Sequence, residues 1–246
     1  MLSRVTTNDE LPTLARPRER AVGRVFAIAA VTAGVLVVVV LLGRADGQGR
    51  RWPTSSLQSL TRLTPLPGIA APSFALSDQN GRTVSLASLR GRTVVLEPMD
   101  PECTVECPIT SLEFVEAARD LGTRSSEVAF VGLNVDPAHA RIADVLRFSR
   151  EHHLEQLPNW HFLTGSAGAL RRVWRAYRIV VRPSRNGDVT HSEAMYFIDR
   201  NGLARWVGAP EYNKAAISQW GAAIADIVSH MARASNHSAH AGVGAL

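Results

Sequence analysis

The chain contains only two cysteines, Cys103 and Cys107, and three residues separate them. Disulfides that stabilise a fold close long loops, whereas a bridge between residues this close would constrain very little of the unfolded chain. The pair is therefore better interpreted as chemical, for metal binding or reversible oxidation. If it falls near a first helical turn, both sulfurs lie on one side, because residues four apart are neighbours on a helix.

The residues around the pair predict how its thiols ionise. The apolar run Thr93–Leu96 leads into the cysteine loop as a strand, and Pro108 suits the first turn of a helix. Backbone amides at a helix start lower a thiol pKa, whereas the carboxylates of Glu102 and Glu106 would raise it. Two soft thiolates facing one point suit Cu(I) or Zn(II), and they leave a third ligand to be found. A redox pair without metal stays open as the alternative.

Alternating strands and helices are predicted on both sides of this loop. The apolar run Val128–Val135 is typical of a central strand buried on both faces. Turn residues at Asp78–Gly81 and Asp199–Gly202 indicate two hairpins. Apolar residues at helical spacing predict four helices: one from Pro108, then Ala138–His153, Ala167–Tyr177 and Ala215–Met231. This order predicts an α/β domain over residues 67–231, with a mixed sheet flanked by helices.

An uncharged segment, Val25–Gly43, lies between Arg24 and Arg44. As a helix it would span about 28 Å, close to the ~30 Å hydrocarbon core of a bilayer. A cleaved signal peptide has a shorter apolar region that ends at a small-x-small site, so we predict an uncleaved transmembrane signal-anchor helix. Arginines that precede the span favour a cytoplasmic tail at residues 1–24.

The remaining segments are predicted to be without packed structure. Residues 44–66 hold Gly, Ser, Thr and Pro without periodicity and read as a linker. Residues 232–246 are rich in Ala, Ser, Gly and His and are predicted to form a disordered tail. With the tail 1–24 inside, the folded domain would be attached to the cell membrane on its periplasmic or extracellular side.

The net charge of +5 comes almost entirely from arginine, since Lys214 is the single lysine. This one-sided usage indicates a genomic bias, and the arginines do not interleave with aromatic residues as single-strand binding requires, so no nucleic-acid partner is predicted. Four arginines nevertheless recur at helical spacing: Arg171, Arg175, Arg178 and Arg182. They could dock an acidic partner or lipid headgroups, or form a solvated helix face.

Several motifs, in order, resemble one family. The stretches Ala71–Phe74 and Leu89–Leu96 are similar to the opening of a thioredoxin-like redoxin domain. The segment Cys103–Pro108 resembles the C-x-x-x-C-P motif of the SCO/SenC copper chaperones. Further matches to that family follow along the domain: Pro158–Gly165, Val173–Tyr177, Asp188–Ser192 and Met195–Asp199.

The resemblance implies a thioredoxin-like fold that binds copper through Cys103, Cys107 and His191. Two thiolates and one imidazole satisfy Cu(I) and still accommodate Cu(II). Asp188 is a candidate to orient His191 from outside the ligand set. The implied partner is cytochrome c oxidase subunit II or another extracytoplasmic copper protein. A thiol-disulfide reductant is also expected, because the thiols must be reduced to hold metal.

The sequence departs from the family before the first cysteine, where the lead-in is Glu97–Glu102 and Thr104 stands in place of a common proline. Met99 in the lead-in could be a soft axial ligand, although packing under the loop is the commoner role.

Three other functions compete with the copper carrier. An envelope thiol-disulfide oxidoreductase acting through Cys103 and Cys107 usually has two residues between its cysteines and has no use for His191. A peroxiredoxin would share the T-x-x-C element Thr104–Cys107, but its leading proline would fall on Asp100. A structural zinc site would be one ligand short. We therefore predict a metal carrier rather than an enzyme.

Overall fold

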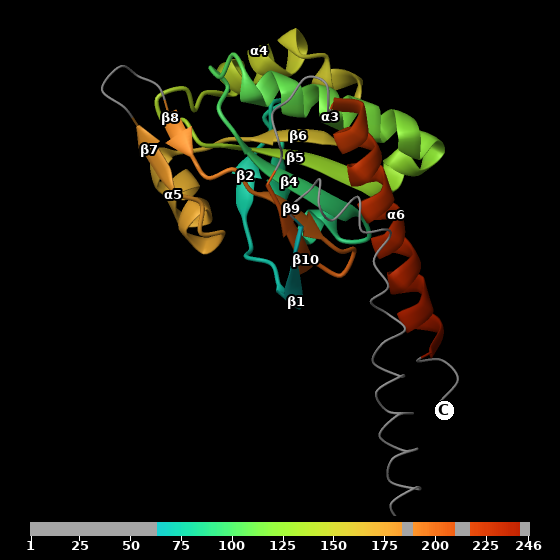
Figure 1. Cartoon of the computed structure of the whole chain (residues 1–246). Helices are drawn as coiled ribbons and strands as arrows, with labels where there is room; N and C mark the ends of the chain where they lie inside the picture. Colours follow the sequence, from blue (N-terminus) through green and yellow to red (C-terminus); the bar gives the residue numbers. More distant parts are fainter. Residues whose placement is uncertain (1–62, 184–188, 210–216, 242–246) are drawn as a thin grey trace, which may run out of the picture. The chain divides into compact units, whose positions relative to one another are not determined.

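Figure 1 shows the computed structural model, which describes residues 63–183, 189–209 and 217–241. All of these residues belong to the second of two compact units, which begins at Trp52. The predicted span Val25–Gly43 and the predicted orienting residue Asp188 lie outside the described residues. Within the described ranges, no helix is both long enough and apolar enough to cross a membrane.

A six-stranded mixed sheet forms the centre of the domain, in the order β1-β10-β9-β4-β5-β6. Strands β4, β5 and β6 are parallel, whereas β9, β10 and β1 are antiparallel to their neighbours. The strand bounds are β1 Thr64–Ala70, β4 Thr93–Met99, β5 Val128–Asn134, β6 Trp160–Leu163, β9 Met195–Ile198 and β10 Leu203–Gly208. The predicted mixed sheet is confirmed.

The two central strands are buried on both faces, as their near-continuous apolar sequences predict. Alternate side chains of β4 point to opposite faces, so Val95 enters one core and Val94 and Leu96 enter the other. In the parallel register Val95 lies opposite Phe130 of β5. Because β4 ends at Met99, the cysteine loop that follows lies at the carboxyl edge of the sheet.

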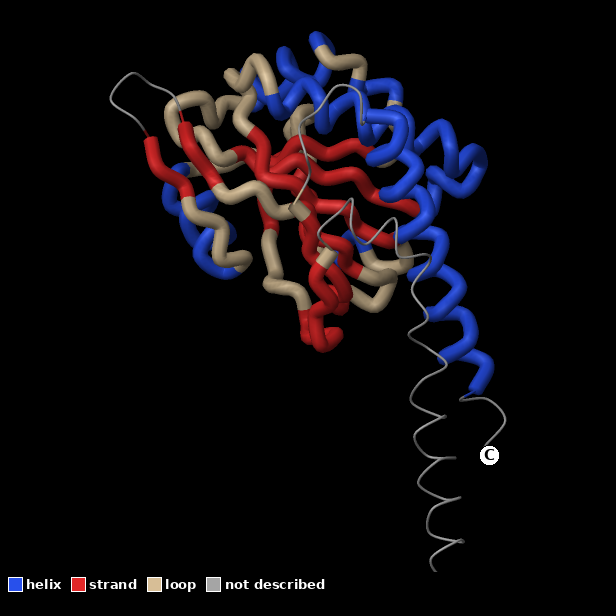
Figure 2. The backbone as a smooth tube through the Cα atoms, in the orientation of Figure 1, coloured by secondary structure: helices blue, strands red, loops and turns tan. Residues whose placement is uncertain are grey.

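Helices cover both faces of the sheet (Figure 2). Helices α3 (Glu106–Leu121), α4 (Ile142–Glu151) and α6 (Ile217–Ala241) pack on one face, around Phe114, Phe148 and Trp220. On the other face, α5 (Ala167–Ala176) and the hairpin of β2 (Ala75–Ser77) and β3 (Thr83–Ser85) pack around residues that include Leu76, Leu170 and Trp174. Short 3-10 helices occupy Ala87–Leu89, Gly122–Glu127 and Leu154–Gln156.

Several element bounds differ from the sequence-based predictions. Helix α4 begins at Ile142 rather than Ala138, because the Asp136 carboxylate accepts the Ala138 N–H at 2.8 Å and holds the chain in a turn. Strand β1 begins inside the predicted linker, and α6 continues past the predicted helix end at Met231. A two-stranded ribbon of β7 (Val181–Pro183) and β8 (Val189–His191) was not predicted, although it carries His191.

Candidate metal centre

The cysteine pair sits where β4 leaves the sheet and α3 begins. Cys107 lies in the first turn of α3 and is buried, whereas Cys103 lies on the preceding loop and is half-buried. Both are free thiols. The Sγ atom of Cys103 accepts the Cys107 backbone N–H at 3.3 Å, and the Sγ atom of Cys107 accepts the Asp100 N–H at 3.4 Å. Backbone donors therefore hold both sulfurs in place.

This arrangement separates the two thiol pKa values. A hydrogen bond from the Cys107 thiol, helped by amides of the first helical turn, lowers the pKa of Cys103 to about 7 against the opposing effect of its burial. The same hydrogen bond, together with burial, raises the pKa of Cys107 well above its ordinary value. The prediction that Glu102 and Glu106 raise the thiol pKa is wrong for Cys103, whose pKa is lowered by hydrogen bonds from the second thiol and from backbone amides.

Cys107 and His191 line the same cavity of about 180 Å³, one from α3 and the other from β8. The His191 ring is half-buried, and its Nδ1 atom lies 3.1 Å from the Ser192 carbonyl oxygen. The cavity is completed by Pro98, Glu106, Thr110, Val189, Thr190 and Glu193. Two of the three predicted ligands are thus brought together from parts of the chain far apart in sequence.

Cys103 opens instead onto a second cavity, of about 290 Å³, between the cysteine loop and α4. Its lining includes Pro101, Thr104, Pro108, Phe148 and His152. Among the residues that the structure describes, no three His, Cys, Asp or Glu side chains are gathered closely enough to hold a metal ion. Met99 is completely buried in the core beneath the loop, which agrees with the packing role.

Carboxylates that the sequence reasoning did not assign surround His191. Asp100 is buried beside the thiols, and its burial raises its pKa although the nearby His191 opposes this. Glu193, on the rim of the smaller cavity, also has a pKa raised by partial burial. The available sequence signals were the place of Asp100 in the lead-in and the position of Glu193 shortly after His191. Both carboxyl groups interact electrostatically with the His191 imidazole.

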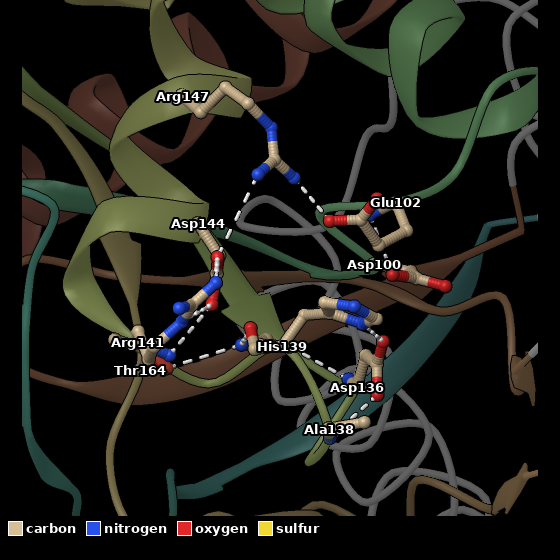
Figure 3. A network of polar contacts seen from close by, with 10 residues as sticks. Asp100, Glu102, Asp136, Ala138, His139, Arg141, Asp144, Arg147 and Thr164 are labelled. Atoms are coloured by element: carbon tan, nitrogen blue, oxygen red, sulfur yellow. Dashed lines mark hydrogen bonds and ion pairs between the residues drawn. The ribbon is translucent and has the colours of Figure 1, made fainter. Parts of the chain in front are cut away.

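A polar network ties the cysteine loop to α4 (Figure 3). Arg147 of α4 forms an ion pair with Glu102, next to Cys103, and lies 3.7 Å from a carboxylate oxygen of Asp144. Asp144 is itself buried and accepts the Arg141 guanidinium at 2.7 Å. At its other end the loop is held by Asp100, whose carboxylate accepts the Glu102 N–H at 2.8 Å. No sequence signal predicted the pairing of Arg147 with Glu102.

The fold and this site define a thioredoxin-like domain with a cysteine pair at a helix start and a histidine that lines the same cavity as the second cysteine. The SCO1/SenC family model matches residues 65–228, and the chain belongs to that family. It is 23% identical over 159 residues to the SCO1 protein homolog of Bacillus subtilis, covering 63% of this chain and 80% of that one. A weaker partial likeness, 26% over 140 residues, links it to peroxiredoxin Q of rice, with 57% of each chain covered.

Solved structures share the fold. The copper-bound structure of Arabidopsis thaliana ScoI is 22% identical with a TM-score of 0.54, and the match covers 64% of this chain and 98% of that one. A Sco protein with a disulfide switch, described as a member of the Sco family of cytochrome c oxidase assembly proteins, is 20% identical with a TM-score of 0.51. That match covers 65% of this chain and 95% of the other. At these identities the likeness establishes the fold, and it confirms the predicted thioredoxin-like topology.

Proposed function

We propose that this chain is a membrane-anchored, extracytoplasmic copper carrier that serves the maturation of cytochrome c oxidase, with Cys103, Cys107 and His191 as the copper ligands. The observation that carries the proposal is the shared cavity of Cys107 and His191 beside a Cys103 thiol that ionises near neutral pH. Family membership supports it, as do similar proteins that were solved with copper or described as oxidase assembly proteins.

Each ligand has a separate role in the proposed cycle. The Cys103 thiolate is available near neutral pH and takes the ion first, because thiolates are the metal-binding form of cysteine. Cys107 releases its proton only when the ion arrives, since metal binding deprotonates a thiol. His191 then completes a three-coordinate site.

The surroundings of this site suit a carrier. Three ligands leave the copper open on one side, so a recipient can supply its own ligand and remove the ion. We extend the proposal to Asp188, as the carboxylate that orients His191, and to Val25–Gly43, as the membrane anchor. A thiol-disulfide reductant keeps the cysteine pair reduced, and cytochrome c oxidase subunit II or another extracytoplasmic copper protein receives the ion.

Copper binding by the full chain in a non-ionic detergent, reduced and kept anaerobic, tests the proposal. We expect one copper per chain, with sulfur and one imidazole in the first shell by X-ray absorption. The Cys103→Ser and Cys107→Ser variants should lose Cu(I), and His191→Ala should lose the imidazole contribution while keeping the sulfur. An unchanged copper spectrum in all three variants would refute the ligand assignment.

A second candidate function is thiol-disulfide exchange, which the unequal thiols favour. The Cys103 thiolate would attack a disulfide of an envelope protein and form a mixed disulfide, releasing one thiolate of that protein. Cys107 would then displace the second sulfur, so the partner leaves with two thiols and the carrier holds a Cys103–Cys107 disulfide. Rapid reduction of a model disulfide by a chain that binds no stable copper would favour this function over the first.

A further inference from the structure

A surface of one charge sign lies on α5 and the segment that follows it. It consists of five exposed arginines, hereafter the basic face: Arg171, Arg172, Arg175, Arg178 and Arg182. The sequence has no aspartate or glutamate from residue 156 to residue 187. Within the described part of the chain, none of these five guanidinium groups forms an ion pair, whereas Arg141, Arg147 and Arg205 all contact carboxylates. Among the described residues, the charge of the basic face is therefore not neutralised locally.

The packing of α5 directs these arginines outward. Leu170, Val173 and Trp174 bury the opposite side of the helix in the core, so the remaining positions face solvent. The helix ends with a Schellman pattern, in which the Arg178 N–H donates to Arg175 and the Ile179 N–H donates to Trp174 at 2.8 Å. Arg178 has a left-handed φ of 57°, a conformation that glycine adopts at lower cost. Arginine therefore occupies a position whose backbone conformation favours glycine.

The basic face lies next to the strand that carries His191. In the ribbon of β7 and β8, Arg182 pairs with Thr190 and Val181 pairs with His191. Strand β8 lines the cavity that contains Cys107, and β7 is its neighbour on the side of α5 (Figure 1). Val180 is 50% exposed and lies in sequence between Arg178 and Arg182. Arginine is enriched in protein interfaces, and Val180 adds an exposed apolar side chain between two of these arginines.

We propose that the basic face docks an acidic surface of the protein that exchanges copper with this chain. The inference rests on the proposed copper-carrier function and adds the chemistry of the partner surface. A partner on this face lies one strand away from His191, so its own metal site can reach the cavity of Cys107. A lipid surface has no metal site to bring there, and for this reason the adjacency to β8 favours a protein. Unneutralised charge beside the exchange site steers an oppositely charged partner and raises the association rate.

Copper transfer from the Cu(I)-loaded full chain in non-ionic detergent to the apo soluble domain of cytochrome c oxidase subunit II tests the proposal by stopped flow. Arg175→Glu reverses one charge on the face and should slow the second-order step about tenfold at low ionic strength. Arg178→Gly removes a charge while relieving the left-handed backbone, so it should fold at least as stably yet transfer about threefold more slowly. Arg124→Glu makes the same charge reversal as Arg175→Glu at an exposed position beyond the far end of α3 and should stay within about twofold of wild type.

Raising the salt concentration should slow the wild type toward the rate of Arg175→Glu, because salt screens exposed charges. Equal rates for Arg175→Glu and Arg124→Glu, or a wild-type rate independent of salt, would overturn the proposal. A lipid-binding outcome would also overturn it. In that outcome, phosphatidylglycerol-containing vesicles protect the α5 amides from hydrogen exchange, phosphatidylcholine vesicles do not, and Arg175→Glu and Arg124→Glu transfer copper at equal rates. If the wild type binds no copper, the proposed copper-carrier function is refuted. The docking is then tested by binding of the copper-free chain to the same domain of subunit II.

Discussion

The Sγ atom of Cys103 accepts the backbone N–H of Cys107 at 3.3 Å, so the first cysteine caps the helix that contains the second. A helix start leaves its first amides without intrahelical partners, and here a sulfur satisfies one of them. Negative charge on that sulfur is stabilised by the amides, while the buried Cys107 keeps its proton. The three-residue spacing therefore produces two thiols with different pKa values rather than an equivalent pair.

This asymmetry predicts the pH dependence of alkylation. Cys103 should react with iodoacetamide with a midpoint near pH 7, slowly below it and at a constant rate above it, because only the thiolate attacks. Cys107 should remain unmodified through this range. Cys107→Ala removes the thiol donor and should move the Cys103 midpoint upward. Peptide mapping by mass spectrometry measures both sites, and a wild-type midpoint near 9 would contradict the geometry.

Removing the imidazole should separate the two copper oxidation states. His191→Ala should weaken Cu(II) binding by roughly tenfold or more, because even the loss of a residue that only orients a metal ligand costs about that much. Cu(I) binding should weaken less, because two thiolates can hold Cu(I) alone. Competition with chelators of known affinity measures both constants. His161→Ala is the control, since His161 lies on β6 with its Nδ1 atom 3.2 Å from Asp78. Equal Cu(II) affinity in wild type and His191→Ala would remove His191 from the site.

Glu113 should make the stability fall as pH rises. Its side chain is completely buried in α3, neither carboxylate oxygen has a hydrogen-bond partner among the described residues, and burial raises its pKa from 4.5 to about 8. A raised folded-state pKa means that full stability is present below pH 4.5. Between about pH 4.5 and 8 only the unfolded chain loses this proton. The free energy of unfolding therefore decreases by about 1.4 kcal/mol per pH unit because of this group.

The Glu113→Met variant keeps an unbranched side chain of similar length and removes the ionisable group. Its unfolding free energy in urea should lose that downward slope between pH 5 and 8, and the gain over wild type should be largest at pH 8. Glu116→Met in the same helix is the control, because the Glu116 carboxylate is partly exposed and forms an ion pair with Arg119. Parallel pH profiles for wild type and Glu113→Met would show that the carboxyl is not held neutral.

The ion pair between Arg147 and Glu102 should control the cysteine loop more than overall stability. An exposed pair contributes about 0–1 kcal/mol, and buried Asp144 keeps its nearer partner Arg141, so Arg147→Met should change the unfolding free energy by about 1 kcal/mol or less. Hydrogen exchange at residues 101–105 should nevertheless become faster, because the loop loses its attachment to α4. Glu102→Gln and the double variant complete a cycle. Additive effects of the two single changes on loop exchange would mean that the pair does not hold the loop.

The crossing of α3 and α6 should not tolerate a side chain at Gly221. A Cβ atom there would lie 2.5 Å from the Cβ atom of Glu116 and 3.1 Å from the Ala117 nitrogen. Gly221→Ala should therefore cost about 1–3 kcal/mol, as overpacking does. Gly168→Ala in α5 is the matched control, because its nearest neighbour is the end of Arg172 at 3.9 Å, and helix propensity should stabilise it by about 0.5–1 kcal/mol. Urea unfolding measures both, and equal effects would contradict the close crossing.

Sequence patterns predicted the elements whose causes are local. The near-continuous apolar run of β5 and the spacing of Leu170, Val173 and Trp174 in α5 reflect periods imposed by backbone geometry, so strand and helix could be recognised in isolation. The helix-start position of the cysteines followed in the same way. The short β7 and β8 were missed because they form a separate two-stranded sheet in the described part of the chain and carry no long apolar pattern.

Tertiary structure decided most of which distant groups meet. The sequence by itself determined a mixed α/β domain with its thiol pair at a helix start, because those features depend on neighbouring residues. It did not determine that Glu102 pairs with Arg147, that Cys103 faces a different cavity from the one Cys107 and His191 line, or that Glu113 is buried without a hydrogen-bond partner among the described residues. These outcomes depend on how helices pack against the sheet, and packing brings together residues whose separation along the chain carries no signal.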